Sequence, residues 1–419
     1  MRKMFLPAAL ALLITSKGFA QNLPSLLLNR NINATFSITA FDPVAREWGI
    51  AVATNNVYVG NSTCYIEAGT GAFSVIAETE PTYGINGLRL LQQGSSIEQA
   101  IRYTKEKDSL ADYRQVAGID SAGNVYAFTG SSLRYWKGVN THHAGKNYVV
   151  MGNQLAQGTL TAMATTFENT SGTLATRLLT ALMAGEAAGG QITGKQSAAL
   201  LVKGSGNEWY NQIDLRVDHS ATPFTDLERL LQYHYGRITL NQALYALQHQ
   251  QPQRGKTLLQ TAEKQTKGWY GIYSRITKAY LLLNDTLQAI RTIKAAVKAE
   301  PRWTENLPAF YCLYPKDSFF AATYPESSFT LTDWNSAISM LNNLQQPEPA
   351  IRLAQEITSR YPHSSHTWYL LACSWQQLHQ PEKAQAANTR ALREDPENAD
   401  ARRLQPALTP LYKKKFTNN

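Results

Sequence analysis

A repeat of 34 residues in the C-terminal half constrains the fold of this 419-residue chain more than any other feature. Five landmark pairs share this spacing: Trp334 and Trp368, Leu344 and Leu378, Pro347 and Pro381, Ala350 and Ala384, and Pro362 and Pro396. Leucine, alanine and glutamine recur around them at helical spacing, so we expect each repeat to be a pair of helices. The small residue lets two helices pack closely, and the closing proline ends the second helix. The repeat therefore predicts an all-α solenoid.

Two earlier units extend the array. One keeps the same internal offsets in Tyr273, Leu283, Ala289 and Pro301, and a degenerate one places Gly255 at the alanine position. The period and its landmarks resemble tetratricopeptide repeats, over residues 237–410. A Pro-rich insert at 307–325 interrupts them, either as a loop across a groove or as an irregular bridging pair. This resemblance implies a protein or peptide partner.

The N-terminal part, by contrast, is rich in strand patterns. Residues 33–54 show a strand, a turn at Asp42-Pro43 and a second strand, with Phe36 and Ile38 alternating against Thr35 and Ser37. Thr35 opens the first strand. If the chain is cut before it, its own α-amine can act as general base for its hydroxyl.

The order of elements over residues 35–222 is strands, two helices, strands, two helices and strands. This is not the strict alternation of a doubly wound parallel sheet. It favours two antiparallel sheets packed on each other with a helical layer on either outer face. We therefore predict an α+β, four-layer αββα sandwich, joined by a linker helix at 223–236 to the solenoid.

Short motifs in this part resemble one known family. They are Thr35-Phe36-Ser37-Ile38, Gly49-Ile50-Ala51-Val52-Ala53, Pro81-Thr82-Tyr83-Gly84, Tyr113-Arg114-Gln115, Phe128-Thr129-Gly130, Gly152-Asn153-Gln154-Leu155, Gly185-Glu186-Ala187-Ala188-Gly189-Gly190, Gly194-Lys195-Gln196-Ser197 and Asp214-Leu215-Arg216-Val217-Asp218. In this order they resemble the bacterial and archaeal domain of unknown function 1028, grouped with the N-terminal nucleophile (Ntn) hydrolases. The chain departs from the family at two places. Residues 77–81 are Ala-Glu-Thr-Glu-Pro where other members usually carry Gln-Ala before Thr-Asn-Pro, and Gln191 stands where other members carry aspartate.

The resemblance implies that Thr35 attacks an amide carbonyl of a small molecule or peptide. Asn153, on a glycine turn at a strand end, is the candidate for holding the oxyanion or orienting the substrate. The candidate substrate-binding residues are Glu78, Tyr83, Gln196, Ser197, Asp214 and Arg216. Turn chemistry for Asn153 and a structural ion pair between Asp214 and Arg216 are the alternatives to these roles.

The first 20 residues have the pattern of a Sec-type signal peptide, with Arg2 and Lys3 before an apolar core and Gly18-Phe19-Ala20 at the cut. No cysteine follows the core, so we expect a secreted or periplasmic protein and not a lipoprotein. Residues 21–34 then remain as a leader or pro-segment. Either the bond between Ala34 and Thr35 is cleaved to mature an enzyme, or Thr35 is simply a strand residue.

The composition limits the classes of partner and cofactor that we expect. The net charge of +9 is modest, with no Arg-rich arm, so nucleic acid is not expected; part of it lies in a basic tail at 411–419. No later stretch approaches 18 apolar residues, which predicts no transmembrane segment in the mature chain.

The His142-His143 pair lacks a carboxylate at ligand spacing, so neither a metal nor another cofactor is expected. Cys312 and Cys373 form either a disulfide or two packed thiols.

Two functional classes remain open at this point. In the first, the chain is an exported Ntn-type amidohydrolase or peptidase with Thr35 as nucleophile, and its repeats dock a substrate or partner. In the second, the catalytic fold is retired and the protein is a non-catalytic binding or assembly module of the cell envelope.

Overall fold

The computed structural model describes residues 34–208 and 211–408. The predicted signal peptide, the leader up to residue 33 and the basic tail lie outside the described residues. The chain forms two compact units, with the boundary between His234 and Tyr235. The prediction of a sheet-rich N-terminal part followed by a helical part is confirmed.

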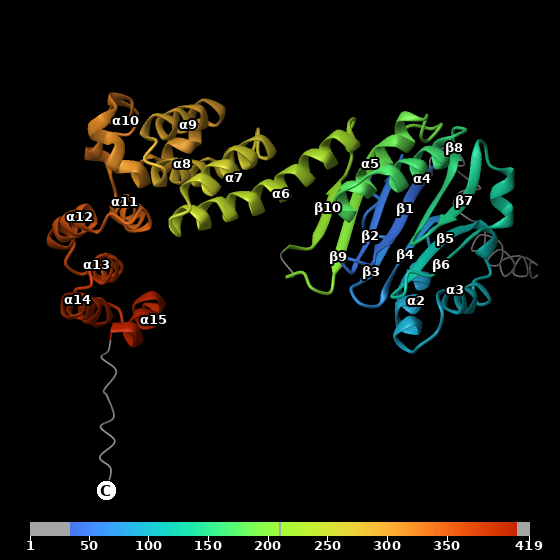
Figure 1. Cartoon of the computed structure of the whole chain (residues 1–419), viewed down its shortest axis with the longest axis horizontal. Helices are drawn as coiled ribbons and strands as arrows, with labels where there is room; N and C mark the ends of the chain where they lie inside the picture. The colour runs from blue at the N-terminus through green and yellow to red at the C-terminus, as the bar shows by residue number, and fades with distance from the viewer. Residues whose placement is uncertain (1–33, 209–210, 409–419) are drawn as a thin grey trace, which may run out of the picture. The chain divides into compact units, whose positions relative to one another are not determined.

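Two antiparallel sheets form the centre of the N-terminal unit (Figure 1). In spatial order, the six-stranded sheet consists of β10 (Ile213–Val217), β9 (Ser197–Gly204), β2 (Glu47–Thr54), β1 (Thr35–Asp42), β8 (Tyr148–Leu155) and β7 (Val139–Gly145). The four-stranded sheet consists of β3 (Cys64–Glu67), β4 (Gly71–Ala77), β5 (Arg114–Asp120) and β6 (Val125–Thr129). Strand β1 therefore lies inside the larger sheet, between β2 and β8.

The predicted alternation along β1 separates two buried faces. The Ser74 hydroxyl on β4 donates to Ser37 Oγ at 3.0 Å, so the face with Thr35 and Ser37 is turned toward the second sheet. Phe36 lies on the other face, beside Gly185. Because β1 is covered on both sides, its polar residues lie in the interior.

Helices pack on the outer face of each sheet. α4 (Thr159–Asn169) and α5 (Leu174–Ala187) contact the six-stranded sheet, and α2 (Thr82–Gln92) and α3 (Ile97–Lys105) contact the four-stranded one. Glycine allows this close approach: a Cβ on Gly49 would lie 2.4 Å from Leu178 of α5, and one on Gly118 would lie 2.6 Å from Ile97 of α3.

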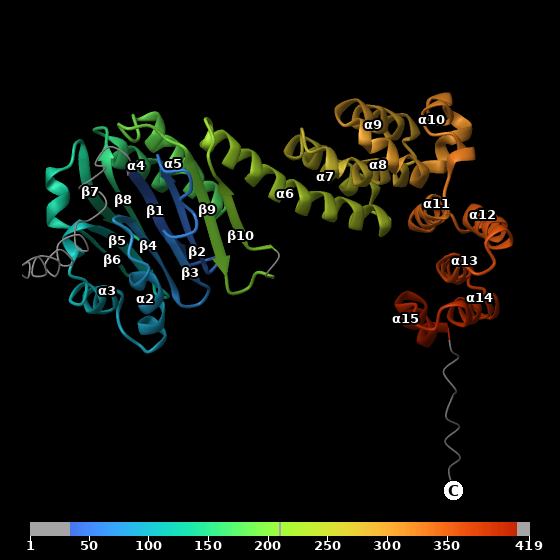
Figure 2. The same cartoon turned by 180° about the vertical axis from the view of Figure 1, so that it is seen from behind.

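The second unit is helical. Its α-helices are α6 (Pro223–Gln248), which continues across the boundary and past residue 236, α7 (Pro252–Gln265), α8 (Tyr273–Leu282), α9 (Thr286–Ala299), α10 (Ser318–Thr323), α11 (Leu331–Asn343), α12 (Pro347–Arg360), α13 (Ser365–Gln377), α14 (Pro381–Glu394) and α15 (Ala399–Leu408). The hairpins α11–α12 and α13–α14 follow one another along this unit (Figure 2).

The tetratricopeptide-like repeat is visible in the turns and at the helix contacts. Four hairpin turns carry a residue with positive φ, and they are Gln250, Asn284, Gln345 and His379. The small residue of each unit is buried, at Gly255, Ala289, Ala350 and Ala384. A Cβ on Gly255 would lie 2.4 Å from Leu247, which explains why the degenerate unit needs glycine.

The Pro-rich insert forms the irregular bridging pair. The 3₁₀ segment η5 (Pro301–Lys316) and α10 pack between α9 and α11, with Phe310 and Phe320 fully buried. All three cysteines are free thiols. Burial raises the pKa of the Cys312 thiol to about 11 and that of Cys64 to about 12.

The contact between α2 and β3 provides a test of the packing in the N-terminal unit. A Cβ on Gly84 would lie 2.1 Å from Cγ of Tyr65, so Gly84→Ala should lower the free energy of unfolding by about 1–3 kcal/mol, as measured by urea denaturation. Gly206→Ala is the control, because a Cβ there meets nothing within 4 Å. Equal stability of the two variants would contradict this packing.

Candidate functional site

A row of polar residues crosses four neighbouring strands where β1 begins. The backbone register pairs Thr35 of β1 with Thr54 of β2 on one side and with Asn153 of β8 on the other. Thr54 is paired in turn with Ser197 of β9. All four side chains are buried. The row therefore places four hydrogen-bonding groups inside the protein at one end of the six-stranded sheet.

The carbonyl oxygen of Ala34 lies in this row and accepts two hydrogen bonds. Thr54 Oγ1 donates to it at 2.8 Å, and the backbone N–H of Asn55 donates at 3.2 Å. Two converging donors polarise a carbonyl and stabilise the negative charge that develops when it is attacked. The Ala34 carbonyl thus carries one backbone hydrogen bond that continues the β1–β2 ladder and one from a side-chain hydroxyl.

The hydroxyl of Thr35 is linked to the same group. Thr35 Oγ1 and Thr54 Oγ1 are 2.9 Å apart. A threonine hydroxyl has one proton, and that of Thr54 is given to the Ala34 oxygen, so Thr35 is the donor in this pair. The chain of hydrogen bonds therefore runs from Thr35 through Thr54 to the carbonyl of Ala34.

Asn153 hydrogen-bonds to the backbone of Thr35. Its Oδ1 accepts from the Thr35 backbone N–H at 3.2 Å, and its Nδ2 donates to Oε1 of Gln115 at 2.9 Å. Gln115 comes from β5 of the other sheet and is fully buried. Its Nε2 donates to the Gly152 carbonyl at 2.9 Å and to Thr129 Oγ1 at 3.1 Å. Gln115 therefore joins the two sheets directly behind Asn153.

The network ends at an imidazole. The Thr129 hydroxyl lies 2.9 Å from Nδ1 of His142 on β7. Burial, together with the neighbouring His143, lowers the pKa of His142 below its ordinary value. Within the described residues, no group of three or more His, Cys, Asp or Glu side chains is arranged to bind a metal ion.

Gln196 and Ser197 hydrogen-bond to the segment that donates to the Ala34 carbonyl. The Gln196 backbone N–H donates to the Thr54 carbonyl at 2.9 Å, and its Nε2 donates to the Asn55 carbonyl at 2.7 Å. Ser197 Oγ donates to the carbonyl of Asn56 at 2.9 Å. The structure therefore brings both predicted residues to the site, where their side chains hold the backbone of residues 54–56.

A strap formed by residues 191–196 crosses the start of β1. At one end Gln191 bridges to Leu155 of β8, and at the other Thr193 Oγ1 accepts from the Asn55 side chain at 2.9 Å. Because β1 lies between β8 and β2, the strap spans the point where the chain enters Thr35. The side-chain amide of Gln191 is buried, and neither its oxygen nor its nitrogen has a hydrogen-bond partner among residues 34–208 and 211–408.

Glu78 lies near the same end of the sandwich. It follows Ala77, the last residue of β4, whose φ of +69° is a strained backbone conformation. The backbone of Glu78 is fixed by Tyr113 and Arg114. Glu80, two residues further along the chain, accepts a hydrogen bond from the backbone N–H of Thr82 with its carboxylate.

Three other predicted residues lie elsewhere. Tyr83 is buried in α2 and donates to the Asp108 carboxylate at 3.2 Å; burial first, and then Asp108, raises its pKa. Asp214 and Arg216 form a half-exposed ion pair at 2.7 Å on β10, three strands from β1. At the usual strand spacing, this pair is about 14 Å from β1. A substrate-binding role for these three stays a prediction without support from proximity.

Three residues of the site were missed in the sequence, namely Thr54, Asn55 and Gln115. Thr54 could have been found, because folding the first hairpin about its turn at 42–47 pairs residue 54 with residue 35. Gln115 carries no such signal, since it reaches Asn153 from the other sheet.

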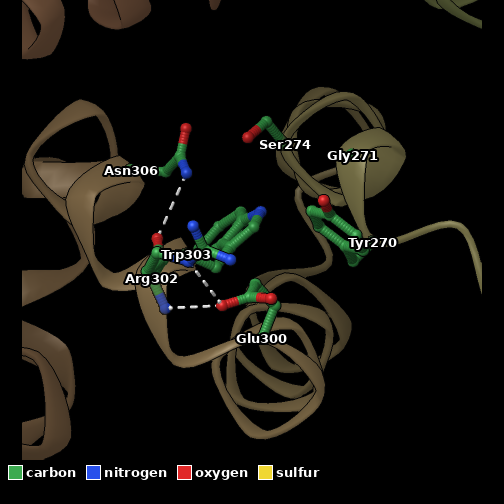
Figure 3. A pocket seen from close by; sticks show the side chains of 7 residues that line it. All are labelled: Tyr270, Gly271, Ser274, Glu300, Arg302, Trp303 and Asn306. Carbon is green, nitrogen blue, oxygen red and sulfur yellow. Dashed lines mark hydrogen bonds and ion pairs between the residues drawn. The ribbon is translucent and has the colours of Figure 1, made fainter.

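The helical unit contains separate hollows. One lies between α8 and η5 and is lined by Tyr270, Gly271, Ser274, Glu300, Arg302, Trp303 and Asn306 (Figure 3). Arg302 donates to the Glu300 carboxylate at its rim at 3.2 Å. A larger open groove of about 770 Å³ lies over α12, α13 and α14, with Trp368 and Trp375 in its lining. The helices described in the structure include none that is long and apolar enough to cross a membrane.

Comparison with known proteins gives a family model and several structural neighbours. The model of the family of unknown function DUF1028 matches residues 35–227. Protein SPO2555 from Silicibacter pomeroyi, described as DUF1028, is 33% identical, with 48% of this chain and 85% of that chain covered and a TM-score of 0.44. None of the curated proteins compared with the chain matches it.

Two neighbours match the helical part. MamA from Desulfovibrio magneticus RS-1 is 15% identical, with 41% of this chain and 82% of that chain covered and a TM-score of 0.20. YrrB, described as a tetratricopeptide protein with an unusual peptide-binding site, is 12% identical, with 40% and 90% covered and a TM-score of 0.22.

The buried amide of Gln115 provides a test of the network. Gln115→Glu places a carboxylate against the Gly152 carbonyl, and it should lower the free energy of unfolding by about 2–4 kcal/mol in urea denaturation at neutral pH. Gln93→Glu, on an exposed side chain, should change it by less than about 0.5 kcal/mol. The network would be refuted if the two variants were equally stable.

Proposed function

Because the chain belongs, through residues 35–227, to the DUF1028 family of unknown function, we propose that it is an exported amide hydrolase of the Ntn type with Thr35 as its nucleophile. In this proposal the two sheets and their outer helices are the four-layer αββα sandwich of an Ntn hydrolase. The observation that carries it is the Ala34 carbonyl, held by Thr54 Oγ1 and Asn55 N–H next to the Thr35 hydroxyl.

The first step is self-cleavage before Thr35. Thr35 Oγ1 bonds to the carbonyl carbon of Ala34 while its proton passes to Thr54 Oγ1, and the Thr54 proton passes to the carbonyl oxygen. The carbon–nitrogen bond then breaks, and the Thr35 nitrogen takes the proton back from that oxygen through Thr54. The product is an ester between Ala34 and the Thr35 hydroxyl. Water hydrolyses it to an Ala34 carboxylate, a free hydroxyl and a free α-amine.

The released α-amine is the base for later turnovers. Unperturbed α-amines have pKa values of about 8, so a useful fraction is neutral near pH 7. Asn153 Oδ1, which accepts from the Thr35 nitrogen, keeps that group in place. The amine takes the hydroxyl proton as Oγ1 attacks a substrate amide and gives it to the leaving nitrogen. Water then hydrolyses the acyl ester.

The surrounding residues have positioning roles in this proposal. Gln196 and Ser197 hold residues 54–56 so that the two oxyanion donors keep their direction. Gln115 fixes the Asn153 amide so that its oxygen faces Thr35. Glu78, which follows the last residue of β4, is a further candidate for substrate binding.

The helical repeats supply a docking surface for a protein or peptide partner in this proposal. Open helical hairpins with aromatic grooves suit an extended or helical peptide. The competing hypothesis is a non-catalytic binding or assembly protein of the cell envelope on a retired Ntn fold. It differs in one respect that can be tested, because it needs neither cleavage before Thr35 nor amide hydrolysis.

Loss of the nucleophile is the direct test of the enzyme. Purified protein, matured by its own cleavage, should hydrolyse fluorogenic 7-amido-4-methylcoumarin amides, and Thr35→Ala should abolish this activity while leaving the fold intact by circular dichroism. Thr35→Ser should retain part of it, since the hydroxyl and the α-amine remain. Full activity of Thr35→Ala would refute the proposal.

Thr54 tests the oxyanion hole separately. Thr54→Val keeps the shape but removes the donor, so it should slow cleavage before Thr35 by about 10²–10³-fold, followed by intact mass. Thr54→Ser should stay close to the native rate. Thr180→Val, at an exposed site on α5, is the control for a threonine-to-valine change. A native cleavage rate in Thr54→Val would exclude the hydroxyl from the reaction.

A further inference from the structure

Ala34 occupies a position with consequences for substrate choice. Its exposed fraction is 0%, and its carbonyl already rests on both oxyanion donors. We propose that this position is the acyl subsite of the enzyme, and that the substrates are amides whose acyl component is a small residue such as glycine or alanine. The inference rests on the proposed function, because it assumes that Thr35 is the nucleophile.

Self-cleavage and substrate hydrolysis pass through esters of the same connectivity. Self-cleavage passes through an ester in which the Ala34 carbonyl carbon is bonded to Thr35 Oγ1. Hydrolysis of a substrate passes through an ester in which the substrate acyl carbon is bonded to the same oxygen. Both esters present a carbonyl oxygen that needs stabilisation, and the donors next to Thr35 Oγ1 are Thr54 Oγ1 and the Asn55 N–H. The acyl group of a substrate is therefore expected where Ala34 lies.

Burial limits the size of the side chain that the Ala34 position can accept. The segments next to this position are held by hydrogen bonds. Gln196 donates to the carbonyls of residues 54 and 55, and the strap is joined to Leu155 of β8 and to the Asn55 side chain. Protein interiors are close-packed, so a fully buried methyl group leaves little space for a longer side chain. One extra methylene in a pocket of fixed shape commonly changes kcat/KM by 10–200-fold.

The substrate side is tested with the wild-type protein after maturation. The probes are acetyl-glycyl-, acetyl-alanyl-, acetyl-valyl-, acetyl-leucyl- and acetyl-phenylalanyl-7-amido-4-methylcoumarin, which differ only in the acyl side chain. The glycyl and alanyl compounds should have the highest kcat/KM, and the leucyl and phenylalanyl compounds should be at least about 100-fold lower. Equal or higher values for the two large residues would overturn the inference.

Substitution of Ala34 tests how the size of this residue affects cleavage before Thr35. Ala34→Gly and Ala34→Ser should cleave within about tenfold of the native rate, and Ala34→Leu should cleave at least about 100-fold more slowly, as followed by intact mass. Ala45→Leu, in the exposed turn of the same hairpin, should cleave normally. Native-rate cleavage of Ala34→Leu would overturn the inference.

The two proposals fail in different ways. Thr35-dependent hydrolysis of all five probes at similar rates would leave the hydrolase in place and remove only the small acyl subsite. An absence of cleavage before Thr35 and of hydrolysis of every probe would remove the hydrolase, and the subsite with it.

Discussion

The hydrogen bond from the Thr54 hydroxyl to the Ala34 carbonyl depends on the register of the first hairpin. That register places Thr54 opposite Thr35, and the register with β8 places Asn153 on the other side. A slip of β1 by one residue would turn Thr35 to the opposite face of the sheet, away from both Thr54 and Asn153. The outer helices matter to the site because they bury the apolar face of β1 and thereby stabilise this register.

The site has an energetic cost that the rest of the sandwich must offset. Thr35, Asn153 and Gln115 are polar and buried, and each is stable there only because its partners are present. Within the part of the chain that the structure describes, the Gln191 side-chain amide has no hydrogen-bond partner, and Gln154 next to Asn153 has a φ of +52°. Unsatisfied groups and strained backbone of this kind gather at functional sites. These features support the proposal that this end of the sheet is a functional site.

The sequence revealed local features and missed those that depend on contacts between distant segments. The 34-residue repeat located the helical hairpins, and alternation located β1, because both arise from the periodicity of a single element. Asn153 and Gln196 were found through motifs. Gln115 also lies in one of the motifs, but no role was predicted for it, because its role comes from the packing of one sheet on the other. For Tyr83 the motif alone could not distinguish a substrate-binding tyrosine from a core residue. Tyr83 lies in the core, where its hydroxyl donates to Asp108.

The N-terminal residue of the purified protein distinguishes an active Ntn hydrolase from a retired fold. Mass spectrometry of the intact chain, with sequencing of its first peptide, distinguishes a chain that begins at Thr35 from one that retains Ala34. The mechanism requires a free α-amine on Thr35, so it predicts Thr35 as the first residue of the active form. If Ala34 is still attached in every molecule, Thr35 has no α-amine, and the account of this site as an Ntn hydrolase is contradicted.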